Sequence, residues 1–224
     1  MGTSRHLQRW LAAGAIASVA TFALPAMAGQ VTDPLGDFLP SYTGPQNADL
    51  DVLSFSSDFD GSVFHLFATL NGAIFKPDGT PNSPGAVYVF GFNRGLGTAR
   101  FGAIAPGVLF DSVAAFIVGG PSVTVDLIAG TGPSALTAGA VVNGNILRLD
   151  VPFTSLPLLA GGFASPNQYT VNLWPRVGLR TNDQISDFAP DNSNISAVPE
   201  PTSLGLIAGG LLAAGALRRR KRIG

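Results

Sequence analysis

Aspartates in two short segments, far apart in the sequence, are the residues of this chain best suited to chemistry. Asp33 and Asp37 frame the run Asp-Pro-Leu-Gly-Asp, and Asp187 and Asp191 frame Asp-Phe-Ala-Pro-Asp. Carboxylate oxygens are the ligands that Ca²⁺ prefers, so a fold that joins the two segments would create a Ca²⁺ site. The alternative is that these aspartates only form turns, for which Asp is well suited.

Groups for covalent or acid–base catalysis are scarce. The chain has no cysteine, and His65 is the only histidine outside the N-terminal leader. It lies within an alternating apolar run, Val63-Phe64-His65-Leu66-Phe67, where a structural role is expected. No pair of aspartates is set apart as an acid–base couple. We therefore expect that the protein is not an enzyme, and a hydrolase built on paired aspartates is the alternative.

The near-neutral total charge hides an acidic central region. The formal net charge is −1, but seven of the 13 Lys and Arg lie in the two terminal segments. Between residues 29 and 198 there are six basic residues and 13 aspartates, which gives a net charge of −7. Binding to nucleic acid requires a basic surface, so we expect no nucleic-acid partner.

Short apolar runs bounded by Gly, Pro, Asn or Asp predict an all-β fold for the central region. Asp60-Gly61 and Asn143-Gly144 each separate two such runs, as in a β-hairpin. About nine strands at this spacing predict a two-sheet antiparallel β-sandwich, similar to a jelly roll. The expected strands are 52–56, 63–70, 86–92, 98–104, 113–118, 123–128, 136–142, 146–151 and 168–174.

The first 28 residues have the pattern of a secretory signal peptide. Arg5 and Arg9 form a basic leader, residues 10–24 are apolar, and Ala26-Met27-Ala28 is a cleavage site with small residues at both required positions. We expect cleavage after Ala28. The β-sandwich domain is then expected over residues 29–190, followed by a linker and a polar motif over 191–201.

The C-terminal segment combines a short polar motif, an apolar run and a basic cluster. The motif is Val198-Pro199-Glu200-Pro201, and the run over 202–217 carries no charge. A helix of 16 residues rises about 24 Å, which is long enough to cross a membrane that thins slightly. The positive-inside rule predicts that the tail over 218–224 is cytoplasmic. Its basic residues are Arg218, Arg219, Arg220, Lys221 and Arg222.

This C-terminal arrangement resembles the bacterial PEP-CTERM sorting signal. The resemblance implies an exported protein that is anchored in the inner membrane by its C-terminal helix until an exosortase-type enzyme processes it. It also implies a place at the cell envelope or outside the cell, in association with exopolysaccharide and biofilm. We therefore expect a non-enzymatic protein of the cell surface or the extracellular matrix.

The central region resembles the DOMON-like superfamily, which includes the family 9 carbohydrate-binding modules. The similarity rests on the two aspartate segments, on Phe110-Asp111-Ser112-Val113 and on the run Leu149-Asp150-Val151-Pro152-Phe153. It implies a β-sandwich and a second candidate function, Ca²⁺-dependent binding of polysaccharide. Trp174 is then the candidate ligand-binding residue, because an exposed aromatic ring can stack on a sugar.

Overall fold

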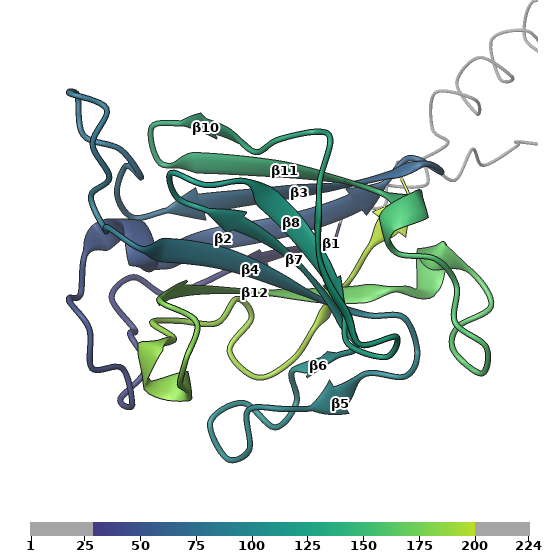
Figure 1. Ribbon diagram of the computed structural model, residues 1–224. Helices are drawn as coiled ribbons and strands as arrows, with labels where there is room; N and C mark the ends of the chain where they lie inside the picture. Colours follow the sequence, from purple (N-terminus) through teal and green to yellow (C-terminus); the bar gives the residue numbers. More distant parts are fainter. Residues whose placement is uncertain (1–28, 200–224) are drawn as a thin grey trace, which may run out of the picture.

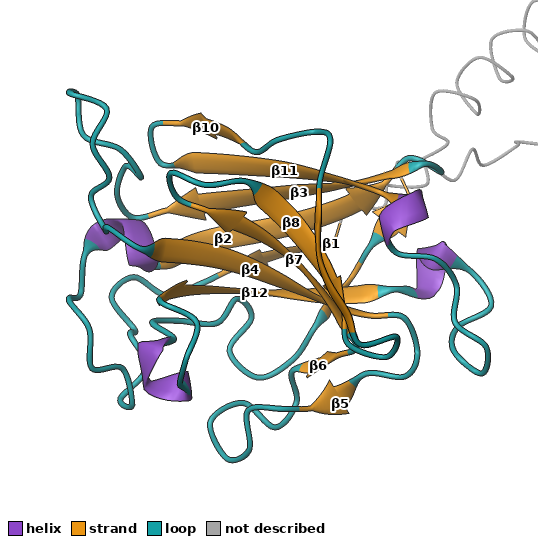
Figure 2. Cartoon of the chain, in the orientation of Figure 1, coloured by secondary structure: helices purple, strands orange, loops and turns teal. Residues whose placement is uncertain are grey.

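Alternating apolar runs fold into two large β-sheets that pack face to face (Figures 1 and 2). The computed structural model describes residues 29–199. One sheet has the order β1 (Gly29–Thr32), β2 (Val52–Phe59), β3 (Val63–Leu70), β11 (Ile146–Pro152) and β10 (Val141–Asn143). The other has the order β13 (Ile195–Ser196), β12 (Thr170–Val177), β4 (Ala86–Asn93), β7 (Ser112–Ile117), β8 (Ser122–Asp126) and β9 (Thr131–Ala135).

Smaller elements complete the sheets and the turns. Strand β14 (Val198–Pro199) pairs in parallel with the end of β2, and β5 (Thr98–Ala99) pairs with β6 (Leu109–Phe110) in a separate hairpin. The described helices are all single 3₁₀ turns: η1 (Ala48–Leu50), η2 (Phe153–Ser155), η3 (Pro166–Gln168) and η4 (Asn182–Gln184).

The all-β prediction is confirmed, and a sandwich fits the arrangement of the sheets. Both predicted hairpin turns are present, with Gly61 at φ 104° and Gly144 at φ 61°, a backbone conformation that favours glycine. Two strand predictions were wrong. Only Thr98–Ala99 of the predicted strand 98–104 is extended in a sheet, and the predicted strand 136–142 is mostly a loop that leads into β10.

The main core lies between the two sheets and is built around aromatic rings. Phe55 of β2 contacts Phe90 of β4 at a centroid distance of 5.8 Å, and Phe64 of β3 contacts Phe92 of β4 at 5.3 Å. All four rings are fully buried. Burial of a phenylalanine side chain contributes about 1.5–3 kcal/mol, so these contacts hold the sheets together.

The second sheet is also covered on its outer face. Trp174 of β12 packs there against Phe101, Phe110 and Phe188, which come from the β5–β6 hairpin and from the segment after η4. Burial on both faces explains why β4 is a nearly continuous apolar run without strict alternation. In Figure 1 the β5–β6 hairpin lies beyond β12, on the side away from the first sheet.

The predicted linker over residues 191–197 is instead part of the folded domain. Ile195 and Ser196 form β13 beside β12, and Ala197 is fully buried, with its N–H donating to the carbonyl of Tyr169 at 3.0 Å. The sequence prediction failed here because the segment is short and polar, and its strand pairing depends on a distant part of the chain.

The predicted signal peptide, the apolar run over 202–217 and the basic tail lie outside the described residues. Among the helices within residues 29–199, none has the length and hydrophobicity needed to span a membrane.

Candidate metal centre

The loop after β1 and the segment after η4 lie side by side at one end of the sandwich. The N–H of Leu39 donates to the carbonyl of Ser186 at 2.9 Å, and the N–H of Asp33 donates to the carbonyl of Leu53 at 2.9 Å. The Ser186 hydroxyl donates to the carbonyl of Leu50 at 2.9 Å, which joins the C-terminal segment to the entry of β2. These hydrogen bonds bring the two aspartate segments together.

Five aspartates converge at this junction, which we call the aspartate cluster. Ligand oxygens of Asp33, Asp37 and Asp191 lie within 4.8 Å of one another, and so do those of Asp37, Asp51 and Asp187. Asp37 belongs to both groups and joins them. The structure thus places all four aspartates singled out in the sequence in one cluster and adds Asp51.

Asp51 is not among the four aspartates predicted as ligands, although the sequence carries a signal for it. It ends the short acidic run Asn47-Ala48-Asp49-Leu50-Asp51, directly before β2, and the sequence does not show which aspartate of the run points to the cluster. The structure separates them. Asp49 accepts a hydrogen bond from Ser83 at 2.8 Å in the protein interior, whereas Asp51 turns to the cluster.

Main-chain amides orient the two most deeply buried carboxylates of the cluster. Asp187 accepts the N–H groups of Val52 at 2.8 Å and Phe188 at 2.7 Å. Asp51 accepts the N–H of Gly36 at 3.1 and 3.0 Å, one distance for each oxygen, and the side-chain amide of Asn71 at 3.0 Å. These bonds fix both side chains in place without neutralising their charge.

Two oxygens of the cluster have no such partner. Asp33 Oδ2 and Asp37 Oδ1 are buried, and neither has a hydrogen-bond partner within residues 29–199. A buried carboxylate oxygen without a partner is destabilising, so it requires a proton, a water molecule or a cation.

The mutual proximity of the carboxylates disfavours their ionised forms. Burial, together with the charges of Asp37, Asp191 and Asp51, raises the pKa of Asp33 to about 7. Burial and the charges of Asp33 and Asp37 raise the pKa of Asp187 to about 9, despite the two amide hydrogen bonds. Burial also raises the pKa of Asp37. The cluster is therefore a site that favours uptake of positive charge.

The oxygen-only donor set suits a hard divalent cation. Ca²⁺ takes six to eight oxygen ligands at about 2.3–2.6 Å and accepts carboxylates in mono- or bidentate modes. Each of the two groups, which share Asp37, offers three carboxylates to such a cation. No histidine or cysteine takes part, which disfavours Zn²⁺.

The prediction of Trp174 as an exposed platform for sugar binding is wrong. Only 2% of Trp174 is exposed, because three phenylalanine rings cover it on the outer face of the second sheet. A residue enclosed in this way contributes to packing and offers no face on which a sugar could stack.

His65 lies on the outer face of the first sheet between two carboxylates. Its Nδ1 is 2.8 Å from Asp150 and its Nε2 is 3.2 Å from Asp60. Partial burial lowers the pKa of His65, but the hydrogen bonds to Asp150 and Asp60 outweigh this effect and raise it. Arg148 also donates two hydrogen bonds to Asp150, at 2.9 and 2.8 Å. With both ring nitrogens engaged, this arrangement stabilises the fold and leaves no ring nitrogen for a substrate.

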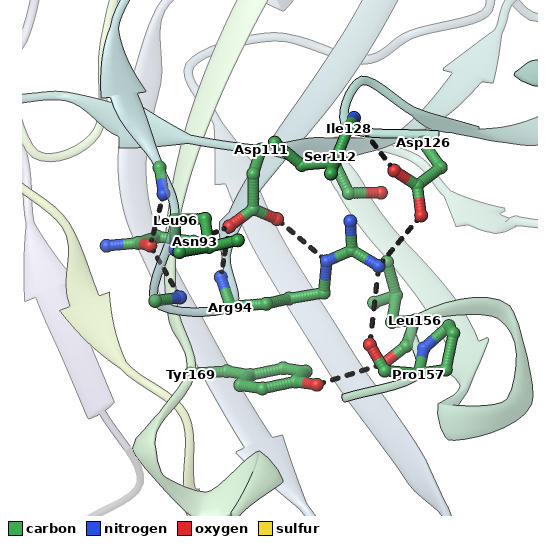
Figure 3. A network of polar contacts seen from close by, with 12 residues as sticks. Asn93, Arg94, Leu96, Asp111, Ser112, Asp126, Ile128, Leu156, Pro157 and Tyr169 are labelled. Atoms are coloured by element: carbon green, nitrogen blue, oxygen red, sulfur yellow. Dashed lines mark hydrogen bonds and ion pairs between the residues drawn. The ribbon is translucent and has the colours of Figure 1, made fainter. Parts of the chain in front are cut away.

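Arg94 lies between the fully buried Asp111 and the partly exposed Asp126, and we call this arrangement the Arg94 network (Figure 3). Arg94 Nε donates to Asp111 at 2.7 Å and Nη1 to Asp126 at 3.0 Å, while the Arg94 main-chain N–H also donates to Asp111, at 2.8 Å. The side chains of Arg94 and Asp111 are fully buried. Nη1 further donates to the carbonyl of Pro157 at 3.3 Å, which ties the loop after η2 to the sheet.

Comparison with known proteins bears on the C-terminal segment. Residues 197–221 match the family model of the PEP-CTERM protein-sorting motif, which confirms the resemblance noted in the sequence. The motif indicates an exported protein that is sorted to the cell envelope and processed by an exosortase. No curated protein is significantly similar to the chain.

Proposed function

We propose that this exported protein is a non-enzymatic component of the cell surface or extracellular matrix whose fold is completed by Ca²⁺ at the aspartate cluster. The sorting motif supports the location. The convergence of five aspartates from the two ends of the domain supports the cation, and it is the observation that carries the proposal.

A bound cation would offset part of the negative charge of the cluster and close the domain. Five carboxylates gather in the cluster, and the buried oxygens of Asp33 and Asp37 have no hydrogen-bond partner among the described residues. Ca²⁺ would attract both the loop that carries Asp33 and Asp37 and the segment that carries Asp187 and Asp191. Its role is then structural, because it fixes the chain after β1 against the chain that leads to the sorting motif.

The non-enzymatic part of the proposal is supported by how the candidate groups are used. His65 has both ring nitrogens on carboxylates, and the aspartates with the most perturbed pKa values point at one another within the cluster. The association with exopolysaccharide and biofilm rests on the resemblance to PEP-CTERM proteins and stays a prediction. So does the similarity of the domain to DOMON-like proteins.

Calorimetric titration of the purified protein with Ca²⁺ tests the cation site. We expect saturable binding, weaker binding of Mg²⁺, which demands a smaller octahedral shell, and loss of Ca²⁺ binding in Asp37→Asn. Asp78→Asn is the matched control, because Asp78 is an exposed aspartate that caps the turn at Thr80. Equal Ca²⁺ binding by the wild type and Asp37→Asn would refute the site.

The alternative, Ca²⁺-dependent carbohydrate binding, loses its predicted aromatic platform with the burial of Trp174. A glycan-array screen with Ca²⁺ and with chelator distinguishes it from the structural role. Ca²⁺-dependent retention of a glycan would favour the binding module, and Ca²⁺ binding without any retained glycan would favour the structural role.

A further inference from the structure

The sorting motif begins inside the folded domain, with no spacer between them. Ser196 pairs with Thr170 and Ile195 with Val171, so β13 is the edge strand of the second sheet. The next residue, Ala197, is fully buried and is the first residue of the matched sorting motif. Val198 and Pro199 then form β14, which pairs with Asp58 and Phe59 of β2 in the first sheet.

The segment 195–199 therefore joins the two sheets. It pairs with the second sheet through β13 and with the first sheet through β14. Along β2, β1 covers residues 54–57 and β14 covers the next two, so the two ends of the domain together protect this sheet edge. Gly29 packs so tightly against the carbonyl of Ser196 that a Cβ atom at this position would overlap it.

A processing enzyme needs an accessible backbone around the residues that it cleaves. Backbone that is paired in a sheet becomes available only when the segment opens locally, and cleavage then follows the population of the open state. Opening of residues 195–199 would break pairing with both sheets and expose Ala197.

We propose that the folded domain restricts the access of the exosortase to the sorting motif of the same chain. Processing then acts on chains in which the segment 195–199 has either not yet paired or has detached from the sheets. Folding and processing thus compete for the same residues, and this competition does not depend on whether the aspartate cluster holds Ca²⁺.

A spacer insertion tests the proposal directly. A flexible Gly/Ser insert of about ten residues between Ala197 and Val198 would let Val198 and the rest of the motif leave the domain while β13 stays paired. In pulse-chase labelling of the exported full-length protein, we expect conversion of precursor to processed product to become about tenfold faster. The same insert between Asp78 and Gly79, in an exposed turn, is the control and should leave the rate unchanged. An unchanged rate with the insert after Ala197 would overturn the proposal.

A disulfide that locks β13 provides the opposite perturbation. Thr170 and Ser196 are directly opposed in an antiparallel pair, and the chain has no cysteine to interfere. The oxidised double variant T170C/S196C should be processed several-fold more slowly than its reduced form. The matched control is T69C/I146C, a directly opposed pair between β3 and β11. Equal processing of the oxidised and reduced T170C/S196C proteins would contradict the proposal.

Discussion

The Arg94 network and the aspartate cluster show two ways of accommodating buried carboxylates in one domain. In the Arg94 network the chain supplies its own cation, and the hydrogen bond from Arg94 lowers the pKa of Asp126. In the aspartate cluster, amides and other carboxylates surround the aspartates, and the pKa values of Asp33 and Asp187 rise. The same side chain is thus a built-in ion-pair partner in one region and an acceptor for an external cation or proton in the other.

Removal of the Arg94 guanidinium should have the largest effect on stability and is the strongest test of this contrast. Arg94→Gln removes the ion-pair partner of Asp111, whose side chain is fully buried. Loss of one member of a buried ion pair is destabilising by about 3–5 kcal/mol, so we expect a fall of that size in the free energy of unfolding, measured by urea denaturation. Arg180→Gln, at an exposed arginine, should change it by less than about 0.5 kcal/mol. A loss below about 1 kcal/mol for Arg94→Gln would show that the network is not a stabilising ion pair.

Addition of Ca²⁺ should stabilise the domain through the aspartate cluster alone. A ligand that binds only the folded state contributes about 2.7 kcal/mol at 100-fold over its Kd, which for a domain of this size raises the Tm by several degrees. The Ca²⁺ increment should vanish with chelator and in Asp37→Asn. It should persist in Arg180→Gln, whose change lies outside both regions. Superimposable melting curves with Ca²⁺ and with chelator would leave the cluster without a cation role.

The Ca²⁺-free cluster should also make stability depend on pH. The pKa of Asp33 is about 7 in the folded state and near 4 in the unfolded state, so the folded state holds an extra proton between these values. The extra proton on Asp33 therefore stabilises the folded state at low pH. As the pH rises from about 4 to about 7, the free energy of unfolding should fall by roughly 1–2 kcal/mol, after allowance for solvent screening. Urea denaturation in chelator should show this decline in the wild type and a smaller one in Asp33→Asn. Parallel pH profiles of the two proteins would argue against a proton on Asp33.

The smallest expected change in stability comes from substitution of His65. Like Arg94, protonated His65 is an internal cation for nearby carboxylates, but it loses its charge as the pH rises. Its raised pKa means that its stabilising contribution is complete below about pH 6.5 and is lost as the pH rises through the folded-state value. Since the histidine is partly exposed, His65→Gln should reduce stability by about 0.5–1 kcal/mol at pH 6 and by less at pH 9. Urea denaturation measures the free energy of unfolding of both proteins, and the difference between them should not increase with pH. An increase would mean that the fold lowers the pKa of His65.

Local patterns in the sequence were enough to predict much of this protein. The alternation in Val63–Leu70 and the Asn143-Gly144 turn are set by residues that are close together in the sequence. The sorting motif, matched over residues 197–221, is likewise a continuous stretch of the chain. Side-chain alternation and turn geometry are fixed within a few residues, which explains why these predictions agree with the structure.

The tertiary structure alone decided which of these residues meet. Asp51 joins the aspartate cluster, Trp174 is covered by three phenylalanines, and Ile195–Ser196 forms a strand because segments far apart in sequence pack together. Burial and charge pairing depend on the register of distant strands and on the loops that cover them, which no local pattern specifies. The sequence therefore determined most of the long strands and the sorting motif, whereas the fold decided which carboxylates lack an internal cation and how closely the motif is tied to the domain.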